Sequence, residues 1–205
     1  ATPDTTAAAN NPGALKQKLI DATLQQYELS SANYNSHQLI LNQSNRFVAL
    51  YNEVQKTRNF LKVGFEYKAS LDLIAKVSSW QKIAVEGVIT HPDSLLTHRN
   101  LTATSILLKE LISRTESWHL TINKFHNKLG AYQHQIDSLS RDKVLYQIPD
   151  DSNAMLAYYQ KFNLLQSDLL PVNKALKAAI DSIQKIEIEI DQLKASLDAD
   201  YSETE

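Results

Sequence analysis

Three of the six histidines recur along one stretch of the chain, and imidazole is the side chain that most readily binds metals or transfers protons near neutral pH. His119, His126 and His134 stand at spacings of seven and eight residues. Two ligands on one helix need a spacing of about three or four residues to share an ion, and no carboxylate completes such a pair beside them. We therefore interpret them as histidines on the solvent flank of a helix and predict no metal site.

Asp150 and Asp151 are adjacent carboxylates, a pair that suits general acid–base chemistry. They stand directly before a predicted helix, where a carboxylate accepts hydrogen bonds from the first free N–H groups. Helix capping explains both residues, so capping is the interpretation that we favour.

Aromatic side chains, among them two Trp and nine Tyr, could form a pocket for an aromatic or cationic ligand. Trp80, Trp118, Tyr132 and Tyr158 all fall on faces that we predict to be core, so packing explains them better than recognition. The sequence predicts no small-molecule substrate.

Other patterns that carry chemistry are missing from the sequence. With four glycines there is no Gly-rich phosphate loop, and we find neither a nucleophile elbow nor a His-Glu-x-x-His pattern. The chain has no cysteine, which removes thiolate ligands and thiol nucleophiles. A formal net charge of -2 gives no electrostatic footprint for nucleic acid. We therefore predict no enzyme, no cofactor and no nucleic-acid partner.

Long helices are the elements that the composition favours, because Gly and Pro interrupt chains and only four Gly and five Pro occur in 205 residues. Residues 1–13 are of low complexity and are predicted to be disordered. Residues 14–92 form a helical N-terminal part, with the Asn/Ser cluster of residues 29–36 as a candidate interruption. Pro92 disfavours helix at the residue before it and is predicted to end this part.

Within this helical part, apolar residues form two faces at helical spacing. The first face consists of Ile40, Phe47, Tyr51, Val54, Leu61 and Phe65. The second segment, which contains Gly64 and Gly87, has a face made of Leu73, Val77, Trp80, Ala84 and Val88.

Residues 93–200 carry a strong heptad pattern, in which apolar residues at positions a and d form the packing seam of a coiled coil. Before the turn, a holds Leu108, Ile122, Leu129 and Ile136, with Thr115 as a polar intrusion, and d holds Leu111, Trp118, Phe125, Tyr132 and Leu139. The turn is predicted near 148–152, where Pro149 and candidate N-cap residues follow one another. This arm and the next are expected to pair antiparallel.

After the turn, the heptad continues without a polar intrusion. Position a holds Met155, Phe162, Leu169, Leu176, Ile183, Ile190 and Leu197, and position d holds Tyr158, Leu165, Val172, Ala179, Ile186 and Leu193. Pro171 falls on the solvent-facing position c, which predicts one kinked helix rather than two. Residues 185–191 alternate like a strand, but their flanks obey the heptad, so we predict helix there too.

Ile180 and Ile188 lie outside this seam and are candidate contacts for a partner. The sequence thus predicts an all-α protein, an elongated helical bundle with a long antiparallel coiled-coil hairpin and a short tail at residues 201–205. Such a chain would act by packing against helices, its own or a partner's.

The first residues, Ala1 to Ala9, are small and polar, and no Lys or Arg precedes Lys16. Such a start is typical of a chain after removal of a signal peptide, although a trimmed chain would look the same. We expect export. No stretch has the apolar length that spans a bilayer.

From about Arg99 onward the chain resembles a known family segment. The resemblance rests on Arg99-Asn100-Leu101, Leu107-Leu108, Leu111, Trp118, Leu129, the Ile148-Pro149-Asp150 turn and the closing heptads. It is similar to the helical region that precedes the membrane-spanning helices in long MscS-type mechanosensitive ion channels of Gram-negative bacteria.

This resemblance implies a periplasmic domain of an inner-membrane, homo-oligomeric channel, attached to the membrane through segments outside this chain. Such a domain would serve assembly, anchoring or regulation of the pore. The alternative is a free-standing periplasmic adaptor, sensor or chaperone-type interaction protein. A hydrophobic helix encoded soon after Tyr201 would distinguish the first from the second.

Overall fold

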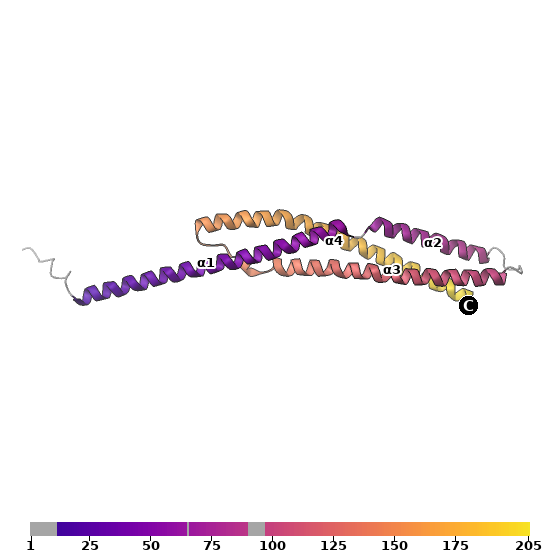
Figure 1. The fold of residues 1–205 in the computed structure, drawn as a ribbon, viewed down its shortest axis with the longest axis horizontal. Coiled ribbons are helices and arrows are strands. Elements are labelled where there is room, and N and C mark those ends of the chain that lie inside the picture. Colours follow the sequence, from indigo (N-terminus) through magenta and orange to yellow (C-terminus); the bar gives the residue numbers. More distant parts are fainter. Residues whose placement is uncertain (1–11, 65, 90–96) are drawn as a thin grey trace, which may run out of the picture. The chain divides into compact units, whose positions relative to one another are not determined.

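A computed structural model describes residues 12–64, 66–89 and 97–205, and it is built of helices (Figure 1). In chain order these are α1 (Pro12–Val63), α2 (Tyr67–Ile89), α3 (Thr97–Ser140), the 3-10 helix η1 (Lys143–Tyr146) and α4 (Ser152–Thr204). No strand occurs in the described ranges. The prediction of an all-α helical bundle is confirmed.

Several predicted boundaries differ from the observed ones. The expectation of disorder for residues 1–13 concerns mainly residues 1–11, which lie outside the described residues, whereas Pro12 and Gly13 already belong to α1. The Asn/Ser cluster of residues 29–36 does not interrupt α1. The predicted stop at 90–93 also lies outside the described residues, and α2 ends just before it at Ile89. The predicted tail is helical as far as Thr204.

The interruption in the N-terminal part lies between the end of α1 at Val63 and the start of α2 at Tyr67. Gly64 begins it. A Cβ at Gly64 would stand 2.9 Å from the carbonyl oxygen of Phe60, closer than real Cβ atoms come to such an atom, and 3.4 Å from the ring of Phe125. This close approach of backbone is the physical reason for glycine at the break.

The connection from α3 to α4 covers residues 141–151, so the turn predicted near 148–152 is only its last part. Asp142 caps η1, because its carboxylate accepts a hydrogen bond from Val144 N at 3.0 Å. Asp151 caps α4 in the same way, accepting from Ala154 N at 2.9 Å. Pro149 is buried. The connection is therefore a folded element and not a bare tip.

The chain divides into two compact units, and α1, α3 and α4 each contribute to both. Of the described residues, unit 1 comprises 12–50 and 139–165, and unit 2 comprises 51–64, 66–89, 97–138 and 166–205.

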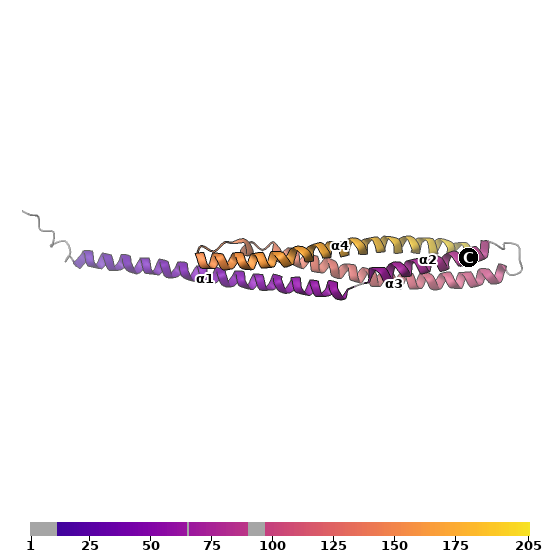
Figure 2. The same cartoon turned by 90° about the horizontal axis from the view of Figure 1, so that it is seen from above.

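In unit 2, three helical tracks run side by side, where a track is one helix or two consecutive helices. The end of α1 and then α2 form one track, which runs alongside α3 and the second half of α4 (Figures 1 and 2). Phe60 stacks near Phe125 of α3, while Thr104, much nearer the start of α3, contacts Ala84 of α2. Numbers rise on one helix as they fall on the other, so this track is antiparallel to α3.

Two clusters of buried side chains form the core of unit 2. The first contains Ile122, Leu129, Leu176, Ala179, Ile183, Ile186 and Ile190. The second contains Val77, Leu108, Leu111, Leu193 and Leu197. Both clusters combine residues of α3 and α4, which pair antiparallel here as predicted. Glu116 lies opposite Lys194 at 3.3 Å and His126 lies opposite Glu187 at 2.8 Å, so numbers rise on α3 as they fall on α4.

Unit 1 has a different partner for α4. Tyr158 packs edge-on against Phe47 of α1 at 5.9 Å, and Phe162 lies in the same way against Tyr146 of η1 at 6.0 Å. The prediction that α3 pairs with α4 along the whole hairpin of residues 93–200 is therefore wrong near the turn. Since α3 ends at Ser140, α1 and η1 cover the first turns of α4 in its place.

Candidate interaction surfaces

The residues that we predicted to form the packing seam lie on the covered side of their helices. Eight of them are buried: Leu111, Leu129, Leu176, Ile183, Ile186, Ile190, Leu193 and Leu197. Trp118, Phe125, Phe162 and Leu169 are half-buried. The polar intrusion Thr115 is 1% exposed, and its hydroxyl donates to the carbonyl oxygen of Leu111 at 2.7 Å. Its own helix thus satisfies the group that burial would otherwise leave unpaired.

One aromatic ring of α1, that of Phe60, completes this seam. Phe60 stands 5.2 Å from Phe125 and 4.9 Å from Tyr132, measured between ring centroids. These contacts explain why the large d residues of α3 are half-buried instead of facing solvent.

The two isoleucines outside the seam differ from each other. Ile188 is 57% exposed, whereas Ile180 is half-buried and packs against the first core cluster. The prediction of a shared partner surface at Ile180 and Ile188 is therefore corrected: only Ile188 presents its side chain to solvent.

An apolar groove lies between α2 and α3 in unit 2. Trp80 stands at its centre, since the two adjoining hollows share Trp80 and Arg114. Their apolar lining comprises Leu73, Val77, Trp80, Ile83, Leu107, Leu111 and Trp118. At the edge, Arg114 and Glu110 form an ion pair at 2.9 Å.

Trp80 is 41% exposed, so its predicted place in the core is wrong. The face of α2 that does point inward centres on Val77, Gln81 and Ala84. Gln81 is buried, and its amide donates to Ser196 at 2.8 Å and to Asp200 at 2.6 Å, both on α4. A polar residue holds the position where apolar spacing had suggested Trp80.

Two histidines of α3, His119 and His126, face carboxylates of α4, which the sequence alone did not reveal. His126 Nδ1 lies 2.8 Å from Glu187 Oε1, and His119 Nδ1 lies 3.4 Å from Asp191 Oδ1. His119 Nδ1 is buried and has no hydrogen bond in the described part of the chain, because the approach to Asp191 lacks hydrogen-bond geometry. His134 is exposed. The solvent-flank interpretation thus fits His134 but not His126.

Within residues 12–64, 66–89 and 97–205, no three His, Cys, Asp or Glu side chains come together as in a metal centre. The contacts of His119 with Asp191 and of His126 with Glu187 join two helices, which is a role in packing.

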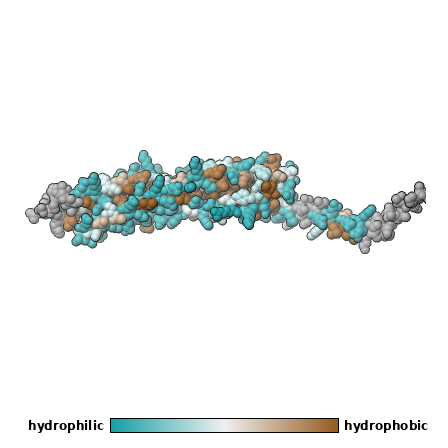
Figure 3. Space-filling view, turned by 180° about the vertical axis from the view of Figure 1, so that it is seen from behind, coloured by the Kyte–Doolittle hydropathy of each residue, from teal (hydrophilic) through white to brown (hydrophobic). Residues whose placement is uncertain are grey.

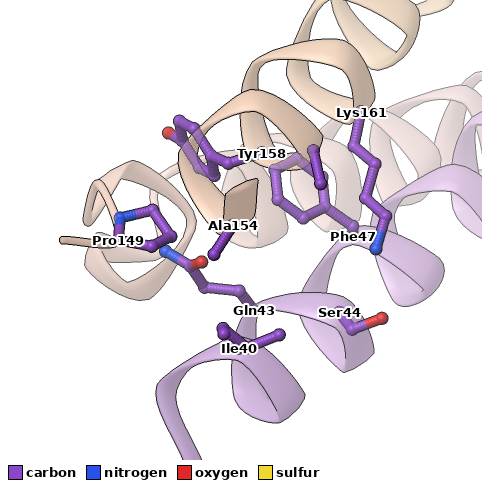
Figure 4. A pocket seen from close by; sticks show the side chains of 9 residues that line it. Ile40, Gln43, Ser44, Phe47, Pro149, Ala154, Tyr158 and Lys161 are labelled. Carbon is purple, nitrogen blue, oxygen red and sulfur yellow. The ribbon is translucent and has the colours of Figure 1, made fainter. Parts of the chain in front are cut away.

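In unit 1, Gln43 fastens α1 to the connection. Its side-chain nitrogen donates to the carbonyl oxygens of Val144, at 3.0 Å, and of Gln147. Arg46 adds an ion pair with Asp142 at 2.8 Å. A cavity of about 50 Å³ remains beside Gln43, with Phe47 and Tyr158 along its wall (Figure 4). Since the space suits one or two water molecules, we assign it to packing.

The surroundings of two tyrosines, Tyr158 and Tyr67, raise the pKa of their phenols. Burial raises the pKa of Tyr158, and the neighbouring phenols of Tyr159 and Tyr146 raise it further. Its hydroxyl donates to the carbonyl oxygen of Leu145 at 2.7 Å. Burial also raises the pKa of Tyr67, whose hydroxyl donates to the carbonyl oxygen of Ala179 at 3.4 Å. Both phenols stay neutral and hold helices together.

The N-terminal part of α1 carries exposed apolar residues at a regular spacing. All residues from 17 to 28 are exposed. One apolar residue recurs every seven positions, and we call this set the α1 stripe: Ile20, Tyr27, Tyr34, Leu41 and Val48. Hydrophobic residues lie on the surface of the helix beside the grey N-terminal end in Figure 3. The stripe was not predicted from the sequence, although its seven-residue spacing is visible there.

No protein-family model, no curated protein and no solved structure matches this chain. In the described part, no helix has an apolar stretch of the length needed to cross a membrane.

Proposed function

We propose that this chain is a non-catalytic helix-packing module that assembles with further helices, first of all those of other copies of itself. The observation that carries the proposal is the apolar surface that remains after its own core has formed. Trp80, Ile83 and Ile106 on α2 and α3 are 41%, 63% and 66% exposed, and the α1 stripe is exposed along its length. Surfaces of this kind mark sites of protein association.

The charged residues agree with this role. Between α3 and α4, Lys194 forms an ion pair with Glu116, and His126 lies within hydrogen-bond distance of Glu187. These pairs fix the register of α3 against α4 and leave the apolar groove and stripe to meet other chains.

In its specific form, the proposal is that the chain is the periplasmic helical region of an MscS-like mechanosensitive channel, serving assembly, anchoring or regulation of the pore. Its support is the resemblance that begins near Arg99 and covers α3, the connection and α4. Membrane attachment would come from segments outside this chain. The second candidate is a free-standing periplasmic adaptor, sensor or chaperone-type protein, and the same exposed surfaces favour it equally.

The first experiment measures the mass of the purified chain by light scattering and sedimentation over a wide range of concentrations. We expect an oligomer that dissociates on dilution. A monomer at every concentration would overturn self-assembly. The second experiment reads the full gene: a hydrophobic helix encoded soon after Tyr201 supports the channel, and a stop codon there supports the free-standing protein.

A further inference from the structure

The part of α1 that carries the stripe has an unusual environment for a helix in water. The side chains of residues 17–28 are all exposed, and three apolar side chains of that stretch, Leu19, Leu24 and Tyr27, are 70%, 56% and 72% exposed. An isolated helix gains most of its stability from packing an apolar face, because intrinsic propensity alone is marginal. A partner helix would supply that packing.

The geometry points to a coiled coil, and we propose that the α1 stripe is the seam between two copies of this chain, an inference that rests on the self-assembly proposed above. With Ile20, Tyr27, Tyr34, Leu41 and Val48 at position d, position a holds Leu24, Ser31, Gln38 and Asn45. A repeat of seven is the spacing that keeps one seam facing a helical partner along its length.

Charge favours a second copy as the occupant. Between residues 22 and 45 the one residue with a formal charge, with His neutral, is Glu28. Two such helices meet without repulsion between like charges, whereas a charged partner would find nothing to attract it. A helix that lies on a lipid surface carries Lys and Arg along its polar face, and this stretch contains neither.

The polar residues of the seam fit the same occupant. Gln38 and Asn45 at position a present amides, which both donate and accept hydrogen bonds, so the amides of one copy pair with those of another. Three of the four a positions are polar, and polar residues at position a lower the stability of a coiled coil. The expected assembly is therefore a dimer that dissociates on dilution rather than a permanent one.

The association can be tested by charge. In the variant that combines Tyr27→Glu and Tyr34→Glu, like carboxylates would meet across the seam and two apolar contacts would be lost. We expect association to weaken by about 100-fold or more, since each lost contact accounts for roughly a tenfold change. Gln25→Glu, on the opposite side of α1, is the matched control and should leave association unchanged.

The contact itself can be tested by cross-linking, because the chain has no cysteine of its own. Tyr34 is the midpoint of the stripe, so two copies bring their residues 34 together whether they pair parallel or antiparallel. Tyr34→Cys should form a covalent dimer on mild oxidation, and Ser36→Cys, about 200° further around the helix, should not.

Three outcomes separate the two proposals. If the natural chain is a monomer throughout, both self-assembly and this seam are wrong. If it is an oligomer that the double Glu variant leaves intact, the seam is wrong but self-assembly stands, and loss of association in Ile83→Glu would then place the contact in the groove. Weakening in the double variant with its main melting transition retained supports the seam, because Tyr27 and Tyr34 are exposed and do not contribute to the core.

Discussion

Apolar residues recur every seven positions in both α4 and the N-terminal half of α1, yet their surroundings are opposite. In α4, Ile183, Ile190 and Leu197 are 0% exposed, whereas Tyr27 and Tyr34 of the α1 stripe are 72% and 65% exposed. The spacing is the same, so spacing alone does not decide burial. It decides which residues share a face, and the rest of the chain decides whether anything covers that face.

The two repeats differ in burial because different helices lie beside them. The second half of α4 meets α3 on one side and the end of α1 followed by α2 on the other, so its seam is covered along its length in unit 2. In unit 1, α1 buries Gln43, Phe47 and Leu50. The stripe lies on roughly the opposite face of the helix from these residues.

The largest expected effect is a polar substitution on the α4 seam. Ile183→Asn removes a fully buried apolar side chain and leaves an amide among apolar neighbours, so we expect the free energy of unfolding to fall by about 3 to 5 kcal/mol. Tyr34→Asn and Ile188→Asn, at exposed positions, should change it by less than about 0.5 kcal/mol at concentrations where the chain is monomeric. Urea denaturation of the whole chain measures all three.

An equal loss at Ile183 and Ile188 would show that the outer face of α4 is core as well. A large loss at Tyr34 in the monomer would mean that the stripe packs within its own chain, and would remove the contrast between the two repeats.

The second prediction compares a buried tyrosine of α4, Tyr158, with an exposed tyrosine of the α1 stripe, Tyr27. Burial raises the pKa of Tyr158, so its phenol ionises at about pH 10 in the unfolded chain and at a higher pH in the folded chain. Its contribution to stability is therefore complete below about pH 10 and is lost as the pH rises through the folded pKa. Tyr158→Phe should be less stable at neutral pH by about 1 kcal/mol, from the lost hydrogen bond, and should lose less stability on going to alkaline pH.

Tyr27→Phe, on the exposed stripe, is the control, and we expect it to follow the natural chain at every pH. The measurement is urea denaturation at neutral pH and again near pH 10.5. An alkaline loss that is as steep in Tyr158→Phe as in the natural chain would show that other groups cause it.

Local chemistry and periodicity predicted much of the fold. The a residues of α3, such as Ile122 and Leu129, are fully buried, and α4 runs unbroken through Pro171, which lies on its exposed side, as the heptad register required. Capping was also foreseeable, since Asp151 stands directly before α4 and caps it.

Features that depend on contacts distant in sequence were not predicted. At the break between α1 and α2, the ring of Phe125 from α3 lies 3.4 Å from where a Cβ of Gly64 would stand, and apolar spacing gives no signal of it. The exposure of Trp80 and the pairing of His126 with Glu187 depend on how α2 and α4 are rotated about their axes. Residue spacing in a single sequence predicts which residues share a helix face, but it does not predict how far each helix is rotated about its axis.

The third prediction uses two glycines of unit 2 that differ in the space around them. Gly64→Ala would place a Cβ 2.9 Å from the carbonyl oxygen of Phe60, so we expect a loss of at least about 1 kcal/mol. Gly130→Ala meets nothing within 4 Å inside α3 and should stabilise the chain by about 0.5 to 1 kcal/mol through helix propensity. Thermal melting measures both, and equal signs would contradict the crowding at Gly64.

The smallest expected effect concerns the hydrogen bond between His126 of α3 and Glu187 of α4. His126 Nδ1 lies 2.8 Å from Glu187 Oε1, with side chains 28% and 21% exposed, and because a carboxylate only accepts, the imidazole is the donor. A double-mutant cycle of His126→Ala and Glu187→Ala should give a coupling free energy of about 0.5 to 1 kcal/mol.

The pair of Glu110 and Arg114, more exposed and within one helix, is the comparison, and its coupling should be about 0.3 to 0.5 kcal/mol. Partial burial is the physical reason for the difference, because solvent screens the second pair more completely than the first. Zero coupling at His126 and Glu187 would mean that apolar contacts alone set the register of α3 against α4, and the histidine would then return to the solvent-flank interpretation.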